Sequence, residues 1–201
     1  MDEQRAERHQ KRMQRQKAVV DQQVQQANKD KGLIVVLTGN GKGKSSSGFG
    51  MIARALGHGM QVAIVQFIKG AMSTGEEYFF RGLPQQVRYH VVGDGFTWDT
   101  QNLDQDIASA KAGWTICQQL LTDKHIDLIL FDELNIVLKM GYLESKQVLA
   151  DIEKRPPQQH VIITGRGAPD DIISAADTVS RIEDVKHAFR SGIRAQKGIE
   201  L

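Results

Sequence analysis

The chain has 201 residues, of which 40% are hydrophobic and 25% charged, and its formal net charge is +2. This length and composition are ordinary for one soluble globular domain, or for one domain with an arm. A single cysteine, Cys117, excludes a disulfide framework within the chain, and no apolar run reaches membrane-spanning length. The N-terminus is charged where a signal peptide needs an apolar stretch, so we predict a cytoplasmic protein.

Residues 1–31 differ from the rest of the chain and are read as an N-terminal basic helical arm. They contain eight Lys or Arg and five Asp or Glu, which leaves the remaining residues slightly acidic. Their sparse apolar residues, such as Val20, Val24 and Ala27, have the spacing of a weakly amphipathic helix. Two interpretations stay open: a solvated or partly disordered leader, or a basic helix that folds over an anionic site or contacts nucleic acid.

After the arm, apolar runs typical of strands alternate with helical segments. Strands are predicted at residues 33–37, 62–67, 87–92, 128–131, 161–163 and 178–182, and helices at 45–56, 76–81, 103–121, 144–153 and 170–175. This alternation predicts an α/β domain over residues 32–201, with a mostly parallel sheet flanked by helices. Ligands of such sheets bind at the carboxyl ends of the strands.

The segment at 38–47, TGNGKGKSSS, joins the first predicted strand to the first predicted helix. A strand, a Gly-rich turn and a helix start in this order form a cradle for phosphate. The standard pattern G-x-x-x-x-G-K-[ST] would place its first glycine at Thr38, but the nearest glycine is Gly39, which suggests an unusual phosphate geometry. The alternative is a Gly-rich turn with an incidental basic pair. The expected nucleotide-binding residues are Gly39, Asn40, Gly41, Lys42, Gly43, Lys44, Ser45 and Ser46.

Two carboxylates, Asp132 and Glu133, follow the apolar strand predicted at 128–131. In P-loop folds, a strand beside the loop strand delivers an acidic group to the metal ion. Taken alone, either residue would more often be a solvated helix cap or first-turn residue. Together with the phosphate loop, the pattern favours Ser45, Asp132 and Glu133 as ligands of magnesium.

Two more turns follow strands at the same edge of the predicted sheet. Arg166, in the turn at 164–167, is either a surface residue or a partner of the polyphosphate. The segment at 93–99, GDGFTWD, carries Phe96 and Trp98 two residues apart. These aromatic residues either pack in a core cluster under the loop or form an apolar wall for a bulky flat ligand. Generic P-loop ATPase chemistry needs no such wall.

Together these segments resemble the P-loop type of corrinoid adenosyltransferase, the ATP:cob(I)alamin adenosyltransferase family. The resemblance rests on residues 38–45, 65–70, 95–102, 132–134, 161–167, 176–180 and 185–189. The Phe-Thr-Trp segment beside this unusual P-loop is highly specific, and the arm resembles the N-terminal helix of the family. One departure is the pair Ser45 and Ser46, where two threonines are expected, but serine keeps the hydroxyl that a magnesium ligand needs.

The resemblance implies an enzyme that transfers the 5′-deoxyadenosyl group of ATP to the Co(I) centre of a corrinoid and releases triphosphate. Lys44 would stabilise the charge on the triphosphate, with Mg²⁺ or Mn²⁺ as the metal ion. Phe96 and Trp98 match the aromatic pair that excludes the lower axial ligand from cobalt. Lys186 and His187 match a segment near the nucleotide, without an assigned role.

The resemblance also bears on partners and substrate. It implies a homodimer supplied with electrons by a reduced flavin or flavoprotein, with neither a membrane nor a nucleic acid as partner. Whether the natural corrinoid is complete cobalamin or a biosynthetic precursor stays open.

Two other functions fit parts of the sequence. The first is a RecA-like or kinase-like P-loop ATPase that transfers or hydrolyses the γ-phosphate. The second is a nucleic-acid-binding module whose basic arm holds phosphates. The glutamines and acidic residues of the arm make it a poor electrostatic stripe, so this second function ranks last.

Overall fold

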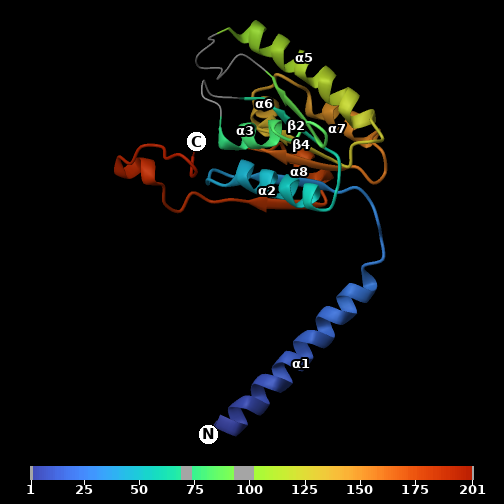
Figure 1. Cartoon of the computed structure of the whole chain (residues 1–201), viewed down its shortest axis with the longest axis vertical. Coiled ribbons are helices and arrows are strands. Elements are labelled where there is room, and N and C mark those ends of the chain that lie inside the picture. Colours follow the sequence, from blue (N-terminus) through green and yellow to red (C-terminus); the bar gives the residue numbers. More distant parts are fainter. Residues whose placement is uncertain (1, 69–73, 93–101, 201) are drawn as a thin grey trace. The chain divides into compact units, whose positions relative to one another are not determined.

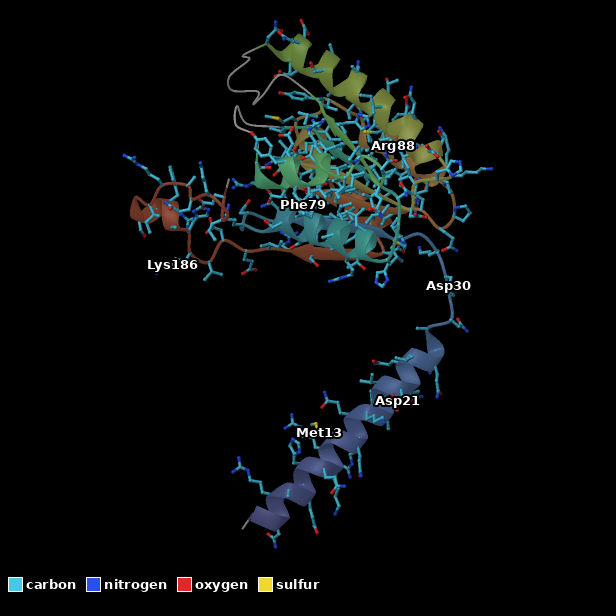
Figure 2. All side chains as sticks on the ribbon, in the orientation of Figure 1. Met13, Asp21, Asp30, Phe79, Arg88 and Lys186 are labelled. Carbon is cyan, nitrogen blue, oxygen red and sulfur yellow. The ribbon has the colours of Figure 1, made fainter. Side chains whose placement is uncertain are left out.

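The computed structural model describes residues 2–68, 74–92 and 102–200, and the chain divides into two compact units, Met1–Lys31 and Gly32–Leu201. The first unit contains one helix, α1 (Asp2–Gln26), followed by a short extended segment. From residue 4 onward every side chain of α1 is exposed, and Met13 and Asp21 project from it (Figure 2). Within its own unit, α1 therefore packs against no core.

The second unit is built on one six-stranded sheet (Figure 1). Its strands are β1 (Ile34–Thr38), β2 (Val62–Gln66), β3 (Val87–Val91), β4 (Leu128–Asp132), β5 (His160–Thr164) and β6 (Thr178–Arg181). The strand order is β3-β2-β4-β5-β1-β6, and all of these pairings are parallel. The predicted α/β class with a parallel sheet is therefore confirmed.

Helices cover both faces of this sheet (Figure 1). The helical elements are α2 (Lys44–Gly57), α3 (Gly75–Arg81), α5 (Leu103–Thr122), α6 (Leu134–Lys139), α7 (Ser145–Glu153), α8 (Asp170–Ala175) and the 3-10 helix η1 (Ala188–Ser191). α6 is missing from the predicted elements because its apolar residues continue the hydrophobic run of β4 almost without interruption.

Two core clusters result, one on each face, because successive side chains of a strand point to opposite sides. In β4, Ile129 and Phe131 pack in the cluster that includes residues of α5 and α7, while Leu130 packs in the cluster that includes residues of α2 and α3. Cys117 of α5 is buried in the first cluster, and burial raises the pKa of its thiol. In the described part of the chain, no helix has the length and apolarity needed to cross a bilayer.

The order of strands corrects one expectation from the sequence. The acidic strand β4 does not lie beside the loop strand β1, because β5 lies between them and pairs with both. Parallel strands are joined through crossover helices, so succession along the chain does not determine which strands are neighbours. As a result, the end of β5 separates the phosphate loop from the two carboxylates and can contact both.

Candidate active site

The loop after β1 leads directly into α2. Gly39 and Gly43 have φ values of 100° and 112°, in the left-handed region that favours glycine. Gly43 is the N-cap residue of α2 and supplies no side-chain cap, and Lys44 is the first residue of the helix. The first backbone N–H groups of a helix lack partners within the helix and carry partial positive charge. The start of α2 is therefore suited to an anion such as phosphate.

The segment that follows β6 lies against this loop. The backbone N–H of Gly41 donates to the carbonyl of Ile182 at 2.8 Å, and the N–H of Ile182 donates to the carbonyl of Thr38 at 2.8 Å. A Cβ atom at Gly39 would lie 2.3 Å from the carbonyl oxygen of Ile182, and one at Gly41 would lie 2.3 Å from that of Glu183. Packing against residues 182–183 thus requires glycine at 39 and 41, which gives the displaced glycine a structural reason that the sequence did not reveal.

The two lysines of the loop have different environments. Lys44 is buried, with 6% exposure, and its Nζ donates to the carbonyl of Gly41. Burial lowers the pKa of Lys44; Glu133 acts to raise this pKa, and Arg166 acts to lower it. Lys42 is exposed, and its Nζ lies 3.7 Å from Oε1 of Glu200. Lys44 is therefore held inside the loop, whereas Lys42 is on its surface.

Asp132, the last residue of β4, is held from both sides. It is 3% exposed; its Oδ2 accepts a hydrogen bond from Nε2 of Gln66 at 3.0 Å, and its Oδ1 accepts one from Oγ1 of Thr164 at 2.7 Å. The Thr164 hydroxyl in turn accepts from the backbone N–H of Glu133 at 3.0 Å. The end of β5 therefore ties the Asp132 carboxylate to the backbone of the next residue.

Glu133 has an unusual backbone and an unpartnered side-chain oxygen. With φ at 61°, it is the one non-glycine residue with positive φ in the part of the chain that the structure describes. Such a conformation costs on the order of 1 kcal/mol and is found most often at functional sites. Its Oε2 is buried and accepts no hydrogen bond from the described residues. Burial and the neighbouring Asp132 raise the pKa of Glu133 to about 7, against the opposing charges of Lys44 and Arg166.

These residues fit a hard divalent cation. Mg²⁺ and Mn²⁺ prefer oxygen ligands, and Mg²⁺ in nucleotide sites takes one or two protein ligands together with phosphates. The buried, unpartnered Oε2 of Glu133 is a ligand of this type, and half-buried Ser45 in the first turn of α2 carries a hydroxyl. Together with the positive charge of Lys44 and Arg166, this arrangement is suited to a polyphosphate with its metal ion.

Two family models match the sequence. One, described as ATP:corrinoid adenosyltransferase BtuR/CobO/CobP, matches residues 30–201, and the other, Cob(I)alamin adenosyltransferase N terminal, matches residues 1–24. The chain belongs to the ATP:corrinoid adenosyltransferase family. Relatives that are each named a corrinoid adenosyltransferase extend over nearly the whole chain. The protein from Pseudomonas aeruginosa is 60% identical, covering 97% of this chain and 96% of its own length.

More distant members of the ATP:corrinoid adenosyltransferase family align over the same length. The relatives from Escherichia coli K12 and Salmonella typhimurium are 46% and 45% identical, and each alignment covers 96% of this chain and 98% of the relative. Domain III of the Thermotoga maritima replication initiation protein DnaA superposes with a TM-score of 0.39 and 12% identity, over 75% of this chain and 54% of that chain. That likeness is too distant to bear on fold or function.

Within this member of the adenosyltransferase family, the structure brings most of the predicted site residues to one edge of the sheet. The loop residues follow β1, Asp132 and Glu133 end β4 and begin the next turn, and exposed Arg166 follows β5. Ser46 and Asn40 are exposed. Lys186 projects from the segment between β6 and η1 (Figure 2), and the His187 side chain accepts a hydrogen bond from the N–H of Phe189. Phe96 and Trp98 lie outside the described residues.

Sequence reasoning missed three residues of this candidate site. Gln66 and Thr164 are the last residues of β2 and β5, Tyr89 lies in the middle of β3, and the hydrogen bonds that they form lead to Asp132. The available signal was a polar residue that ends an otherwise apolar strand. Gln66 and Thr164 both have this pattern, and both lie in segments that carry the family resemblance.

Proposed function

We propose that this chain transfers the 5′-deoxyadenosyl group of ATP to the Co(I) centre of a corrinoid and releases triphosphate. Membership of the ATP:corrinoid adenosyltransferase family, over residues 30–201, supports this reaction. The observation that carries the proposal is the meeting of two features at one edge of the sheet. These are a phosphate-type loop with a buried Lys44 and an acidic turn in which Oε2 of Glu133 has no hydrogen-bond partner among the described residues.

The reaction needs no side chain that removes a proton. The cobalt of Co(I) supplies an electron pair to C5′ of the ribose, the Co–C bond forms, and the C5′–O bond breaks with its electron pair going to the triphosphate. Because Co(I) is itself a strong nucleophile, the protein has two tasks. It must hold C5′ in line with cobalt, and it must stabilise the negative charge that develops on the departing triphosphate.

The residues after β1 and β5 suit the second task. In our proposal the N–H groups at the start of α2 bind phosphate oxygens, and Lys44 transfers its hydrogen bond from the Gly41 carbonyl to the triphosphate. Lys42 and Arg166, which are both exposed, add positive charge at the surface of the proposed triphosphate site. Ser45, Asp132 and Glu133 would hold Mg²⁺ or Mn²⁺, which when bound neutralises part of the charge on the triphosphate.

Product analysis tests this function against a P-loop ATPase. The protein is incubated with ATP, Mg²⁺ and chemically reduced cobalamin, with a parallel reaction that lacks the corrinoid. We expect inorganic triphosphate and a light-sensitive Co–C bond, both only when the corrinoid is present. ADP and phosphate formed without any dependence on the corrinoid would instead identify an enzyme that cleaves the γ-phosphate.

We also propose that Phe96 and Trp98 form an apolar wall that keeps the lower axial ligand away from cobalt. An axial nitrogen donor raises the energy of the orbital that accepts the electron when Co(II) becomes Co(I), so its removal makes reduction easier. We expect Phe96→Ala and Trp98→Ala to retain activity with chemically pre-reduced Co(I) but to lose activity when the assay starts from Co(II). Equal losses with both substrates would contradict this role.

In this proposal residues 32–201 bind nucleotide and corrinoid, and the arm helps to retain the corrinoid. The match of residues 1–24 to the N-terminal family model supports the second part. We expect deletion of residues 1–28 to weaken corrinoid binding, measured by equilibrium dialysis, more than it lowers the thermal unfolding midpoint. Unchanged corrinoid binding in the shortened chain would contradict this role and favour the interpretation of the arm as a solvated leader.

The family also supports a homodimer in the cytoplasm that receives electrons from a reduced flavin or flavoprotein. Light scattering of the purified protein tests the first point, since a mass equal to that of one chain would contradict it. Stopped-flow reduction of protein-bound Co(II) by reduced flavin tests the second. No Co(I) formation in that experiment would exclude free flavin as the donor.

A further inference from the structure

We propose that Gln66, Thr164 and Tyr89 are positioning residues that hold the Asp132 carboxylate, and the turn at Glu133, for the metal–triphosphate complex. This inference rests on the proposed function, because it takes the acidic turn to be the metal side of the nucleotide site. It assigns a role to polar side chains of β2, β3 and β5 that the proposed reaction does not itself use.

The side chains of Gln66, Asp132 and Thr164 share one face of the sheet. Gln66 is paired with Asp132 in the register of β2 and β4. Two residues earlier in their strands, Ile64, Leu130 and Ile162 all belong to the core cluster that contains residues of α2. Because side chains alternate along a strand, Gln66, Asp132 and Thr164 project to the same face as those residues. That is the face covered by the helix that begins at Lys44.

The hydrogen bonds of this network run in one direction, from Tyr89 through Gln66 to Asp132. The Tyr89 hydroxyl donates to Oε1 of Gln66 at 2.6 Å, and Nε2 of the same amide donates to Asp132 at 3.0 Å. A carboxylate only accepts, so the NH₂ group of the amide faces it, and the Tyr89 hydroxyl then donates to the remaining amide oxygen and holds the side chain in place. With the amide reversed, its oxygen would face the carboxylate and repel it. Tyr89 therefore acts on Asp132 through Gln66.

The hydrogen-bond network extends to the turn at Glu133. Thr164 donates to Oδ1 of Asp132 and accepts from the backbone N–H of Glu133. One hydroxyl thus joins the fixed carboxylate to the residue with left-handed backbone and an unpartnered Oε2. If this hydroxyl is lost, both the rotamer of Asp132 and the turn that orients Glu133 lose a support.

Burial of these polar side chains costs free energy. Gln66 and Asp132 are 6% and 3% exposed, and Thr164 is fully buried. Apolar residues of the same size in strands this hydrophobic would avoid the cost of burying an amide and a charge. The Nε2 of another buried amide, Gln159, donates to the carbonyls of Leu120, Asp123 and Ile126, at the end of α5 and in the segment before β4. Gln159 is therefore a matched control for the loss of a buried amide.

The experiment measures ATP binding by calorimetry, once with Mg²⁺ and once with EDTA, in the absence of corrinoid. The variants are Gln66→Met, Thr164→Val and Tyr89→Phe, with Thr164→Ser and Gln159→Met as controls. The readout is the factor by which Mg²⁺ raises the affinity for ATP. This factor reports the coupling between metal and nucleotide, which a general loss of stability does not change.

We expect Gln66→Met and Thr164→Val to reduce this factor by about tenfold, the usual effect of removing a partner of a metal ligand, while affinity in EDTA changes by less than about twofold. Tyr89→Phe keeps the ring and is the mildest variant, with an expected loss of up to about fivefold. Thr164→Ser restores the hydroxyl and should retain the wild-type factor. Gln159→Met should lower the thermal unfolding midpoint and leave the factor unchanged.

Two results would overturn the inference. In the first, Gln66→Met and Thr164→Val bind ATP with the wild-type magnesium factor, or lose affinity equally in Mg²⁺ and EDTA, so that the network only supports the fold. In the second, the wild-type protein itself gains no affinity from Mg²⁺. That second result would also remove the metal site from the proposed function, whereas the first would leave that site in place.

Discussion

Two carboxylates of this chain have opposite environments: buried Asp151 in α7, and Glu133 after β4, which is half-buried with a buried Oε2. Asp151 accepts hydrogen bonds from Trp114 at 2.9 Å and Gln118 at 2.8 Å, and it pairs with Lys154 at 2.8 Å. Burial alone would raise the pKa of Asp151, but the hydrogen bonds from Lys154, Trp114 and Gln118 hold it well below its usual range. Glu133 has no described partner at Oε2, and its pKa rises to about 7.

The difference distinguishes a carboxylate whose hydrogen bonds maintain the fold from one whose buried oxygen is suited to a ligand. A buried charge is tolerated in a protein when donors surround it, as they surround Asp151 between α5 and α7. At Glu133 the backbone is in a costly conformation and the carboxylate lacks such donors. A metal ion or the positively charged part of a bound complex would supply the missing partner of the Glu133 carboxylate.

The largest expected effect comes from the lysines that accompany these two carboxylates. Lys44→Ala should lower turnover by about 100- to 10,000-fold, because a positive charge that stabilises the departing triphosphate is lost. Lys154→Ala, the matched change beside Asp151, should leave turnover within about twofold. Both are measured with saturating ATP and pre-reduced corrinoid. Near wild-type turnover in Lys44→Ala would contradict the assignment of this lysine to the leaving group.

A smaller effect, on stability, is expected at Asp151. Asp151→Ala leaves the donors of Trp114 and Gln118 buried without a partner, so we expect the free energy of unfolding to fall by about 2–4 kcal/mol. Urea denaturation followed by circular dichroism measures this change. Turnover assayed well below the unfolding transition should stay near the wild-type value. A loss of turnover larger than the unfolded fraction explains would mean that Asp151 also serves the active site.

The smallest effect is the contribution of Glu133 to the dependence of stability on pH, to which His90, whose pKa is lowered by burial, contributes in the opposite sense. Its folded-state pKa, about 7, lies above the value of about 4.3 in an unfolded chain, so between these values the folded state binds the extra proton. The contribution of Glu133 to the stability of the nucleotide-free protein should therefore fall as pH rises from about 5 to 7. Urea midpoints of Glu133→Gln should lack this decline, and an identical slope in both proteins would argue against the raised pKa.

Asp151 gives the opposite pH dependence and serves as the internal reference. Its folded-state pKa is lowered, so its contribution to stability is present above the unfolded value of about 3.9 and is lost as pH falls below that value. The change of the urea midpoint with pH, between about pH 5 and 7, should therefore not depend on Asp151. If Asp151→Ala changed the slope of urea midpoint against pH in that range, Asp151 could not serve as the reference for Glu133.

The sequence by itself determined the class of the fold and the local motifs of the site. Alternating apolar runs and helical segments sufficed for a parallel α/β sheet, and the turn at 38–47 and the acids at 132–133 could be identified because each is a short continuous pattern. The predicted strands and helices match the observed ones except at their ends, and the elements α6 and η1 were not predicted. The roles of these site residues stay predictions.

Only the tertiary structure decided how these parts meet. The insertion of β5 between β1 and β4, the contact of residues 182–183 with the loop glycines, and the path from Tyr89 through Gln66 to Asp132 join residues far apart in the chain. Local sequence encodes strand and turn preferences but not the partners of a buried side chain. For that reason the sequence showed two carboxylates after β4, and the fold distinguished the one that is held by the protein from the one that is left without a partner.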